Sequence, residues 1–423
     1  MLFRFSLYGF LKNQRYFEPF LILALLEKGL SFFAIGTLIA FREIATNVLE
    51  IPSGSIADLL GRRRAMQLSF AAYLGSFLMF WQATEQLWLW PAMLLFAIGD
   101  AFRTGTHKAM IFEWLRAKGR SSDKTKVYGY TRSWSKLGSA TSVVIGATLL
   151  FWLDSYAAVF LLSAVPVALN LVNLSSYPSY LDGDLQKGSR LRDVWQHSRA
   201  AIAESARKPR LRALLMESMS FEGVFHAAKD YLQPLLATAA AAWLTTKSGF
   251  DAFDPDSWSE LQRSTFVIAP VYLSLNIISA LASRRAHQLV AAVGNNEQRA
   301  ASLLWSIYTG LFGGLLIGEI THSIAASIAA FVLLHALQNL WRPILITRID
   351  QVTDNQNSAV ALSIESQSRR LATVCFAPIF GLAIDTTRAA SPNAHGIYWP
   401  IAVVGILVGL VTIFLRRRPR PPT

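Results

Sequence analysis

The sequence contains a single cysteine, Cys375, among its 423 residues. One thiol excludes an intrachain disulfide, so the fold has to be held together by packing. Charged residues are also scarce, at 16% of the chain, whereas soluble domains contain about 25%. Hydrophobic residues make up 53%. This balance predicts a chain that lies in a lipid bilayer.

Signatures of enzymes and metalloproteins are missing as well. No glycine-x-serine fragment has the strand-turn-helix context of a nucleophile elbow, and no phosphate-binding glycine loop occurs. Histidine, cysteine and acidic residues do not show the spacing of metal ligands. We therefore expect no enzymatic activity, no metal and no cofactor.

Apolar stretches recur along the whole chain. A helix needs about 20 residues to cross the hydrocarbon core, and the sequence accommodates about twelve such helices with short loops. The first stretch lacks a small-residue cleavage site, so we interpret it as a crossing and not as a signal peptide. The expected crossings are residues 5–27, 30–58, 66–84, 89–116, 125–152, 156–176, 208–238, 261–286, 299–318, 321–349, 358–385 and 396–415.

Basic residues exceed acidic ones and give a net charge of +13. They gather in alternate loops and at the C-terminus, namely at 62–64, 116–126, 187–212, 284–285 and 416–418. The opposite loops contain few of them, so both termini are expected in the cytoplasm. A nucleic-acid groove is not expected, because the charges alternate with apolar runs of membrane length.

The most specific motif is the segment 54–64, Gly-Ser-Ile-Ala-Asp-Leu-Leu-Gly-Arg-Arg-Arg, between the second and third expected crossings. Gly54 would let two helices approach closely, and Gly61 would permit a tight turn. The motif resembles the signature loop between helices 2 and 3 of the major facilitator superfamily of membrane transporters, usually written G-x-L-A-D-x-x-G-R-R/K. Ile56 and Leu59 depart from that pattern.

The resemblance implies an all-helical membrane fold with about twelve helices in two pseudo-symmetric six-helix bundles. We place these bundles at residues 1–176 and 208–415, with a cytoplasmic linker at 177–207 and a basic cytoplasmic tail at 416–423. Within the linker, residues 191–206 show the spacing of an amphipathic helix on the membrane surface.

The resemblance also implies a gate at the signature loop. Its expected members are Gly54, Asp58, Gly61, Arg62 and Arg63. A degenerate echo of the loop is expected in the second half at 276–288, where Ser283-Arg284-Arg285 would form the corresponding turn.

Ionisable residues occur inside several expected crossings, where each costs about 2.5 kcal/mol or more unless it faces water or a partner. Many recur at helical spacing and therefore share one face of a helix. We interpret the following as substrate ligands: Arg15, Arg42, Arg103, His107, Lys108, Arg132, Lys229, His335, Asn339, Arg342 and Arg369. The proton-coupling candidates are Glu222, Glu365 and Asp230. Structural ion pairs are the competing interpretation, foremost for Glu43, Glu50, Asp100, Glu113 and Arg370.

Arg103 is the leading anion ligand in this set, because the small residues 104–106 leave room beside it. A guanidinium at that depth requires water, a carboxylate or a ligand anion as a partner.

These observations favour a secondary transporter that moves a small solute by alternating access. Mid-membrane bases slightly outnumber acids, so an anionic or zwitterionic solute is expected, with protons as a candidate coupling ion. A monomer in the bacterial inner (plasma) membrane is expected, in contact with the lipid bilayer and with no nucleic-acid partner.

Two alternatives stay open. A flippase for a lipid or lipid-linked substrate would have a cavity that opens laterally. A non-transporting sensor or assembly factor would pair its buried charges completely.

Overall fold

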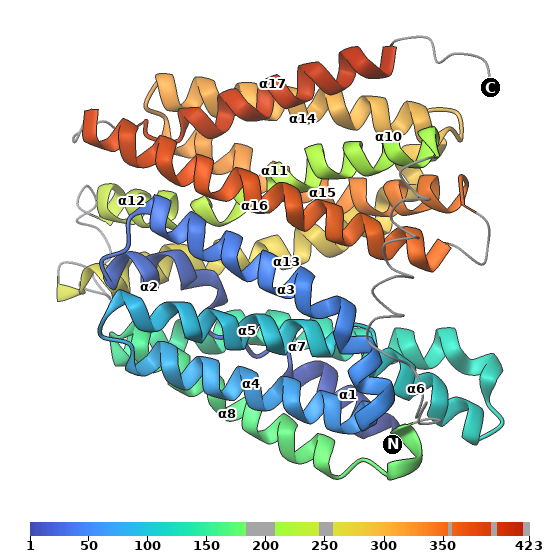
Figure 1. Ribbon diagram of the computed structural model, residues 1–423. Coiled ribbons are helices and arrows are strands. Elements are labelled where there is room, and N and C mark those ends of the chain that lie inside the picture. The colour runs from blue at the N-terminus through green and yellow to red at the C-terminus, as the bar shows by residue number, and fades with distance from the viewer. Residues whose placement is uncertain (183–207, 245–256, 354–357, 391–395, 418–423) are drawn as a thin grey trace. The chain divides into compact units, whose positions relative to one another are not determined.

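The computed structural model describes residues 1–182, 208–244, 257–353, 358–390 and 396–417, and the regular elements among them are all helices (Figure 1). Eight described helices contain a segment long and apolar enough to cross a membrane. These candidate spans are Phe32–Glu50, Lys126–Leu153, Tyr156–Ser175, Glu260–Ala292, Glu297–Ile320, Ile324–Asp350, Val360–Ala390 and Trp399–Arg416. The chain is therefore an all-helical integral membrane protein, as predicted, and the count of twelve crossings stays a prediction.

Three expected crossings are interrupted helices. The first consists of α1 (Leu2–Leu11), a short 3-10 turn at Glu18–Phe20 and α2 (Leu21–Glu27). The fourth consists of α5 (Leu89–Arg103) and α6 (Thr106–Ala117), which meet at Gly105 with its φ of +77°. A backbone with positive φ cannot continue a right-handed helix, and glycine adopts it at little cost.

The seventh expected crossing is interrupted twice. It runs from α10 (Pro209–Ser218) through a π-helical turn at Met219–Gly223 into α11 (Val224–Ala228). A 3-10 turn and α12 (Leu232–Leu244) complete it. Turns of π-helix are frequent at functional sites because they re-aim the side chains of the residues they contain. This one contains Glu222, a proton-coupling candidate.

Internal contacts divide the chain into two compact units. The first contains the described parts of residues 1–29, 41–200 and 249–273. Its helices are α1, α2, α4 (Arg62–Gln82), α5, α6, α7 (Lys124–Leu153) and α8 (Tyr156–Ser175), with parts of α3 (Phe32–Leu60) and α13 (Glu260–Ala292). In this unit α4 lies between α5 and α8 (Figure 1).

Close approach of α1 to α7 shapes the first unit. A Cβ added to Gly138 of α7 would lie 2.5 Å from the backbone oxygen of Phe10, and one added to Gly146 would lie 2.6 Å from that of Tyr16. Only glycine leaves room for such close contacts with the backbone of α1 and of the segment that follows it. The same pairing brings the polar end of α1 against the basic part of α7.

The second unit contains the described parts of residues 30–40, 201–248 and 274–423. Its helices are α10, α11, α12, α14 (Glu297–Ile320), α15 (Ile324–Asp350), α16 (Ser358–Ala390) and α17 (Trp399–Arg417), with the remaining parts of α3 and α13. A fully buried aromatic cluster joins its elements: Phe221 stacks on Trp341 with ring centroids 4.5 Å apart and contacts Trp305 edge-on. This packing fixes the π-helical turn against α14 and α15.

Two sequence-based predictions concern a turn within residues 276–288 and a surface helix at 191–206. The turn expected at Ser283–Arg285 is wrong, because α13 continues to Ala292 and the chain turns at Gly294 and Asn295, both with positive φ. The sequence between 276 and 292 contains no glycine or proline that would end the helix. The amphipathic helix expected at 191–206 lies outside the described residues.

Candidate functional site

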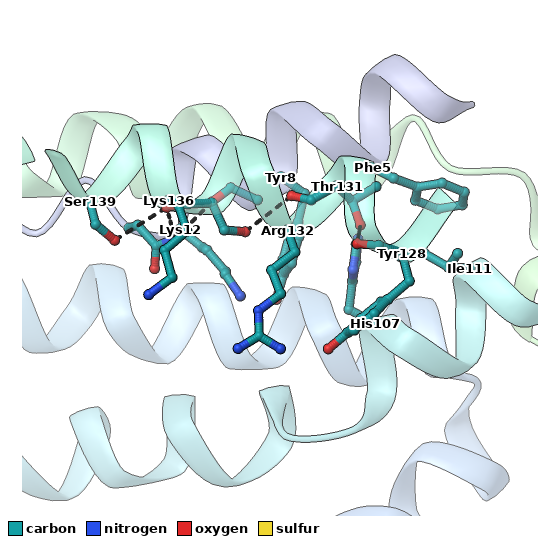
Figure 2. A pocket seen from close by; sticks show the side chains of 13 residues that line it. Phe5, Tyr8, Lys12, His107, Ile111, Tyr128, Thr131, Arg132, Lys136 and Ser139 are labelled. Atoms are coloured by element: carbon teal, nitrogen blue, oxygen red, sulfur yellow. Dashed lines mark hydrogen bonds between the residues drawn. The ribbon is translucent and has the colours of Figure 1, made fainter. Parts of the chain in front are cut away.

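A polar pocket of about 380 Å³ lies within the first unit, between α1, α6 and α7. Pockets of this size are typical of small-molecule sites. Figure 2 shows the pocket from close by. Its lining residues are Phe5, Tyr8, Gly9, Lys12, Asn13, His107, Ile111, Tyr128, Thr131, Arg132, Ser135, Lys136 and Ser139.

Three cations line this pocket. Arg132 and Lys136 stand four residues apart on α7, so their side chains leave the same face of the helix. Lys12 follows the last residue of α1, where that helix ends. Figure 2 shows the three charged groups on the same side of α1 and α7. The lining residues include no aspartate or glutamate, so the described wall of the pocket has a net positive charge.

The neutral polar side chains of the pocket bond mainly to the backbone. The Asn13 amide donates to the carbonyl oxygens of Gly9, at 3.1 Å, and Ser135, at 2.7 Å. The hydroxyl of Thr131 donates to the carbonyl of Tyr128, and that of Ser139 to the carbonyl of Ser135. These bonds use donors internally, which leaves the cations as the strongest groups for a ligand.

His107 belongs to an aromatic cluster at one end of the pocket. Its ring stacks on Tyr8 with centroids 3.6 Å apart and meets Phe5 edge-on at 5.5 Å. Its Nε2 atom lies 3.4 Å from the hydroxyl of Tyr177. One ring face is covered by Tyr8, and His107 forms part of the wall of the pocket.

Arg103 does not line the pocket; it belongs to a neighbouring ion-pair network. Its Nη2 atom donates to Asp100 at 3.1 Å and its Nε atom to the Tyr73 hydroxyl at 3.1 Å. Arg15 lies 3.4 Å from the same carboxylate and over the rings of Tyr73 and Phe96. Of the companions that sequence analysis allowed for Arg103, the carboxylate is the one observed, and Asp100 is confirmed as a member of an ion pair.

The two remaining candidates in the first unit also have neighbours. Arg42 donates to Glu43 at 2.6 Å, which confirms Glu43 as an ion-pair residue. Lys108 lies over the rings of Phe112 and Tyr128, 5.5 Å from each centroid. Neither Arg42 nor Lys108 is among the residues that line the pocket.

In the second unit, two buried carboxylates meet two guanidiniums. Glu222 and Glu365 are fully buried. Arg342 donates to Glu365 at 2.6 and 2.8 Å and to Glu222 at 3.1 Å. Arg369 donates to Glu222 at 3.0 Å, and Ser218 donates to Glu365. The four charges come from the π-helical turn, α15 and α16, and they sum to zero.

The other candidates of the second unit lie around this network. Arg369 donates to Nε2 of His226 at 3.0 Å. Lys229 and Asp230, adjacent in the chain, pair at 2.7 Å. The Nδ1 atom of His335 lies 2.9 Å from the carbonyl oxygen of Phe331, one turn earlier on α15.

Asn339 lies one turn after His335 on α15. Its amide donates to the carbonyl of His335 at 2.8 Å and to the Ser279 hydroxyl of α13 at 3.0 Å. These bonds engage both hydrogens of the amide in the folded chain.

The signature loop is a tight turn that docks on the end of the first unit. Gly61 has a φ of +95°, and an added Cβ would lie 2.8 Å from the Asp182 carboxyl carbon. The Arg63 N–H donates to that carboxylate at 2.8 Å, and Arg62 pairs with Glu113 of α6 at 3.6 Å. Glu113 is thereby confirmed as an ion-pair residue.

Two other members of the expected gate belong to α3. Gly54 is exposed there, and an added Cβ would meet nothing within 4 Å. Asp58 belongs to the same helix, but its side chain lies outside the described part of the structure.

Sequence analysis did not name as site residues four side chains of this pocket and its surroundings, namely Lys12, Lys136, Tyr73 and Asp182. Lys12 appears in the sequence only as an interruption of an apolar stretch, and its opposition to α7 depends on where α1 ends. Tyr73 and Asp182 are distant in sequence from the charges that they bind. A signal for Lys12 did exist, because an unbalanced lysine in the middle of an expected crossing is itself costly.

Comparison with known proteins identifies the family and the fold of the chain. The family model described as "Major Facilitator Superfamily" matches residues 13–373. A search of curated proteins gives no significant match.

Solved structures show the same fold. A mutant of the nucleoside transporter NupG superposes with a TM-score of 0.76 at 12% identity over 98% of both chains. A bacterial homolog of the human lysosomal transporter Spinster gives 0.69 at 14% identity, covering 98% of this chain and 96% of that one. A D-xylose-proton symporter gives 0.65 at 14% identity, covering 97% and 96%. At these identities the likeness shows the fold, and the solute has to be inferred from the site.

Proposed function

We propose that this chain, which belongs to the Major Facilitator Superfamily, carries a small organic anion across the membrane by alternating access. The single observation behind the proposal is the pocket between α1, α6 and α7, whose described lining contains three cations and no carboxylate. The family membership makes the chain a membrane transport protein; the nature of the solute and of the coupling is our proposal.

The electrostatics of the pocket favour an anionic ligand. Cations placed together repel one another, and the repulsion grows where protein or lipid replaces water. An anion relieves it and forms charge-assisted hydrogen bonds, which are stronger than neutral ones. By contrast, Arg103 and Arg342 already have carboxylates at hydrogen-bond distance. We therefore assign substrate binding to Lys12, Arg132 and Lys136, and keep Arg103 and Arg15 as supporting charges.

Transport assays with matched variants test this assignment. Purified protein in liposomes would be assayed for uptake of a panel of labelled organic anions, sugars and amino acids. Arg132→Gln and Lys136→Gln should each lower anion uptake at least tenfold, because each removes one charge-assisted contact worth about 1.5–3 kcal/mol. Lys126→Gln, on the same helix but outside the pocket, is the control and should transport normally. Uptake of neutral solutes alone, unaffected by the pocket variants, would overturn the proposal.

We further propose that the network of Glu222, Glu365, Arg342 and Arg369 couples transport to protons. A proton on either buried carboxylate would weaken its bonds to the guanidiniums and unbalance the network, which is how protonation could drive a conformational change. The pair Lys229 and Asp230 is a weaker candidate because both side chains are 29% exposed.

Neutralised carboxylates test the coupling. Glu222→Gln and Glu365→Gln should abolish uptake driven by a pH gradient while preserving exchange of labelled for unlabelled substrate. The control is Glu297→Gln on α14, a carboxylate outside this network. Gradient-driven uptake at the normal rate in both variants would remove these two residues from the coupling mechanism.

A lipid or lipid-linked substrate is the second candidate. An apolar groove of about 480 Å³ lies between α10 and α17 in the second unit, lined among others by Met216, Leu407 and Val411. The ion-paired side chains of Glu217 and Arg416 also contribute to it. The same liposomes can be assayed for movement of labelled phospholipid between leaflets. A sensor without transport activity is disfavoured, since its charges would be fully paired and the pocket between α1 and α7 has an excess of cations.

The remaining aspects of the proposal rest on the sequence. The distribution of basic residues supports cytoplasmic termini, and we place the protein in a bacterial inner (plasma) membrane as a monomer. The gating role of Gly54, Asp58, Gly61 and the two arginines that follow stays part of this proposal.

A further inference from the structure

We infer that the substrate is a small organic dianion, a molecule with two negative charges such as a dicarboxylate or a phosphate monoester. The inference rests on the proposed transport of an anion and specifies its charge. It follows from the number of cations around the pocket, from their placement on two elements and from what surrounds them.

The charge count comes first. Lys12, Arg132 and Lys136 contribute three positive charges when a bound anion holds the Lys12 ammonium protonated, and the described lining contains no carboxylate. A monovalent anion would leave two of these charges uncompensated. A zwitterion would bring an ammonium group into a wall that offers it no negative partner. A dianion compensates most of the charge and leaves a small excess that still favours binding.

The neighbouring ion-pair network does not cancel this excess. Asp100 is the one carboxylate in contact with both Arg15 and Arg103 there. Glu18 also acts electrostatically on Arg15, so two carboxylates face the two guanidiniums there. With two cations and two carboxylates, this network of the described first unit has no surplus negative charge that would satisfy Lys12.

The placement of the cations suits two separated negative groups. Arg132 and Lys136 are neighbours on one face of α7, where Cβ atoms four residues apart are about 5–6 Å from each other. Lys12 faces the pocket from α1 (Figure 2). The planar guanidinium of Arg132 can bind a carboxylate or phosphate through two parallel hydrogen bonds, while a lysine acts as a point charge. One negative group would meet the α7 pair and the other would meet Lys12.

Matched ligand pairs test the charge requirement. Butyrate and succinate have the same number of carbons and differ by one carboxylate, and glycerol and glycerol 3-phosphate differ by one phosphate. Dicarboxylates of three to six carbons extend the first series. Binding to the full-length protein in detergent would be measured by calorimetry at pH 7.5 and constant ionic strength. At least one dianion of the panel should bind at least tenfold more tightly than its matched partner of lower charge.

Variants connect that preference to the pocket. Lys12→Gln and Lys136→Gln should each reduce the ratio of dianion to monoanion affinity several-fold, since each removes a charge that a monoanion does not need. Arg132→Lys keeps the charge and should preserve the ratio while weakening both ligands. Lys126→Gln should behave as wild type. Size-exclusion profiles and thermal unfolding establish that each variant is folded before its binding is interpreted.

The possible outcomes separate the two levels of the proposal. If butyrate binds as tightly as succinate, and no other dianion of the panel binds more tightly than its matched partner, the dianion inference is wrong while the proposal of anion transport stands. If zwitterionic amino acids bind more tightly than either class, the inference is wrong in the same way. If no anion of the panel binds, or if binding ignores all pocket variants, both the inference and the proposed function fail.

Discussion

Removal of one buried carboxylate, Glu217, should destabilise the protein more than removal of any exposed one. Glu217 of α10 accepts from Arg348 of α15 at 2.7 and 3.1 Å and from Arg416 of α17 at 2.8 Å. Gln298 of α14 accepts from Arg348 at 2.8 Å. The side chains of the three charged residues are only 5–8% exposed. One carboxylate thus joins three helices in a place where water reaches little of it.

The expected size of the effect follows from burial. Breaking a buried ion pair by removing one partner costs about 3–5 kcal/mol, because the charge left behind has no compensation. Glu217→Gln leaves the buried Arg348 with neutral acceptors only, such as the Gln298 side chain. Arg416 keeps the Gln298 carbonyl and the Ser302 hydroxyl at 3.0 Å each. An exposed pair contributes about 0–1 kcal/mol. Asp123, paired with the half-exposed Arg120, is the matched control.

Thermal unfolding in detergent measures the difference. Glu217→Gln should lower the apparent Tm by about 5 °C or more, and Asp123→Asn by about 1 °C or less. The double variant Glu217→Leu/Arg348→Leu should recover the part of the loss that comes from Arg348, since an apolar pair needs no charge compensation. Arg416 keeps its two neutral partners in both variants. Equal shifts for the two single variants, or a double variant less stable than Glu217→Gln, would refute the reasoning.

Two further predictions concern the signature loop and the topology. Gly61→Ala should lower the free energy of unfolding by about 1–2 kcal/mol, measured as a lower Tm, because Gly61 has a positive φ. Gly54→Ala adds a methyl group in open space and should change stability by no more than about 0.5 kcal/mol. Equal effects of the two variants would contradict a strained turn at Gly61. In a Cys375→Ala background, an impermeant thiol reagent added outside should label a cysteine introduced at Ser257 and spare one at Lys118, and the reverse pattern would overturn the predicted orientation.

The sequence was sufficient for the fold because membrane insertion leaves few alternatives. Long apolar stretches have to become helices in a bilayer, so the helical membrane fold follows from hydropathy, while the count of twelve crossings stays a prediction. The helix interruptions were harder to predict. Gly105 could have been tolerated within a helix, as Gly129 is in α7, and its left-handed conformation is a tertiary choice. The turn expected at Ser283 shows the opposite error. It was expected because the second half was assumed to repeat the signature loop of the first, although the local sequence contains no residue that would end the helix.

Of the three cations assigned to the pocket, the expected ligands included only Arg132, and Lys12 and Lys136 were not among them. The sequence placed Arg132 inside an expected crossing. It could not distinguish Arg132 from Arg103, since both are arginines inside expected crossings. The difference lies in Asp100 and Tyr73, whose distance from Arg103 depends on how helices pack. Pairing is a property of tertiary structure, and a charge is available to a ligand only when packing supplies no partner.

The two units differ in whether their buried charges are balanced by protein partners. In the second unit, Glu222 and Glu365 balance Arg342 and Arg369, so a proton is the smallest perturbation that changes the sum of charges. In the first unit, the described pocket wall has an excess of cations, so an anion is the perturbation that restores balance. A transporter that binds an anion in one place and a proton in another changes two sums of charges, each with a different ligand. Coupling then requires that the two sums be linked by a conformational change, because no residue of the pocket belongs to the Glu222 network.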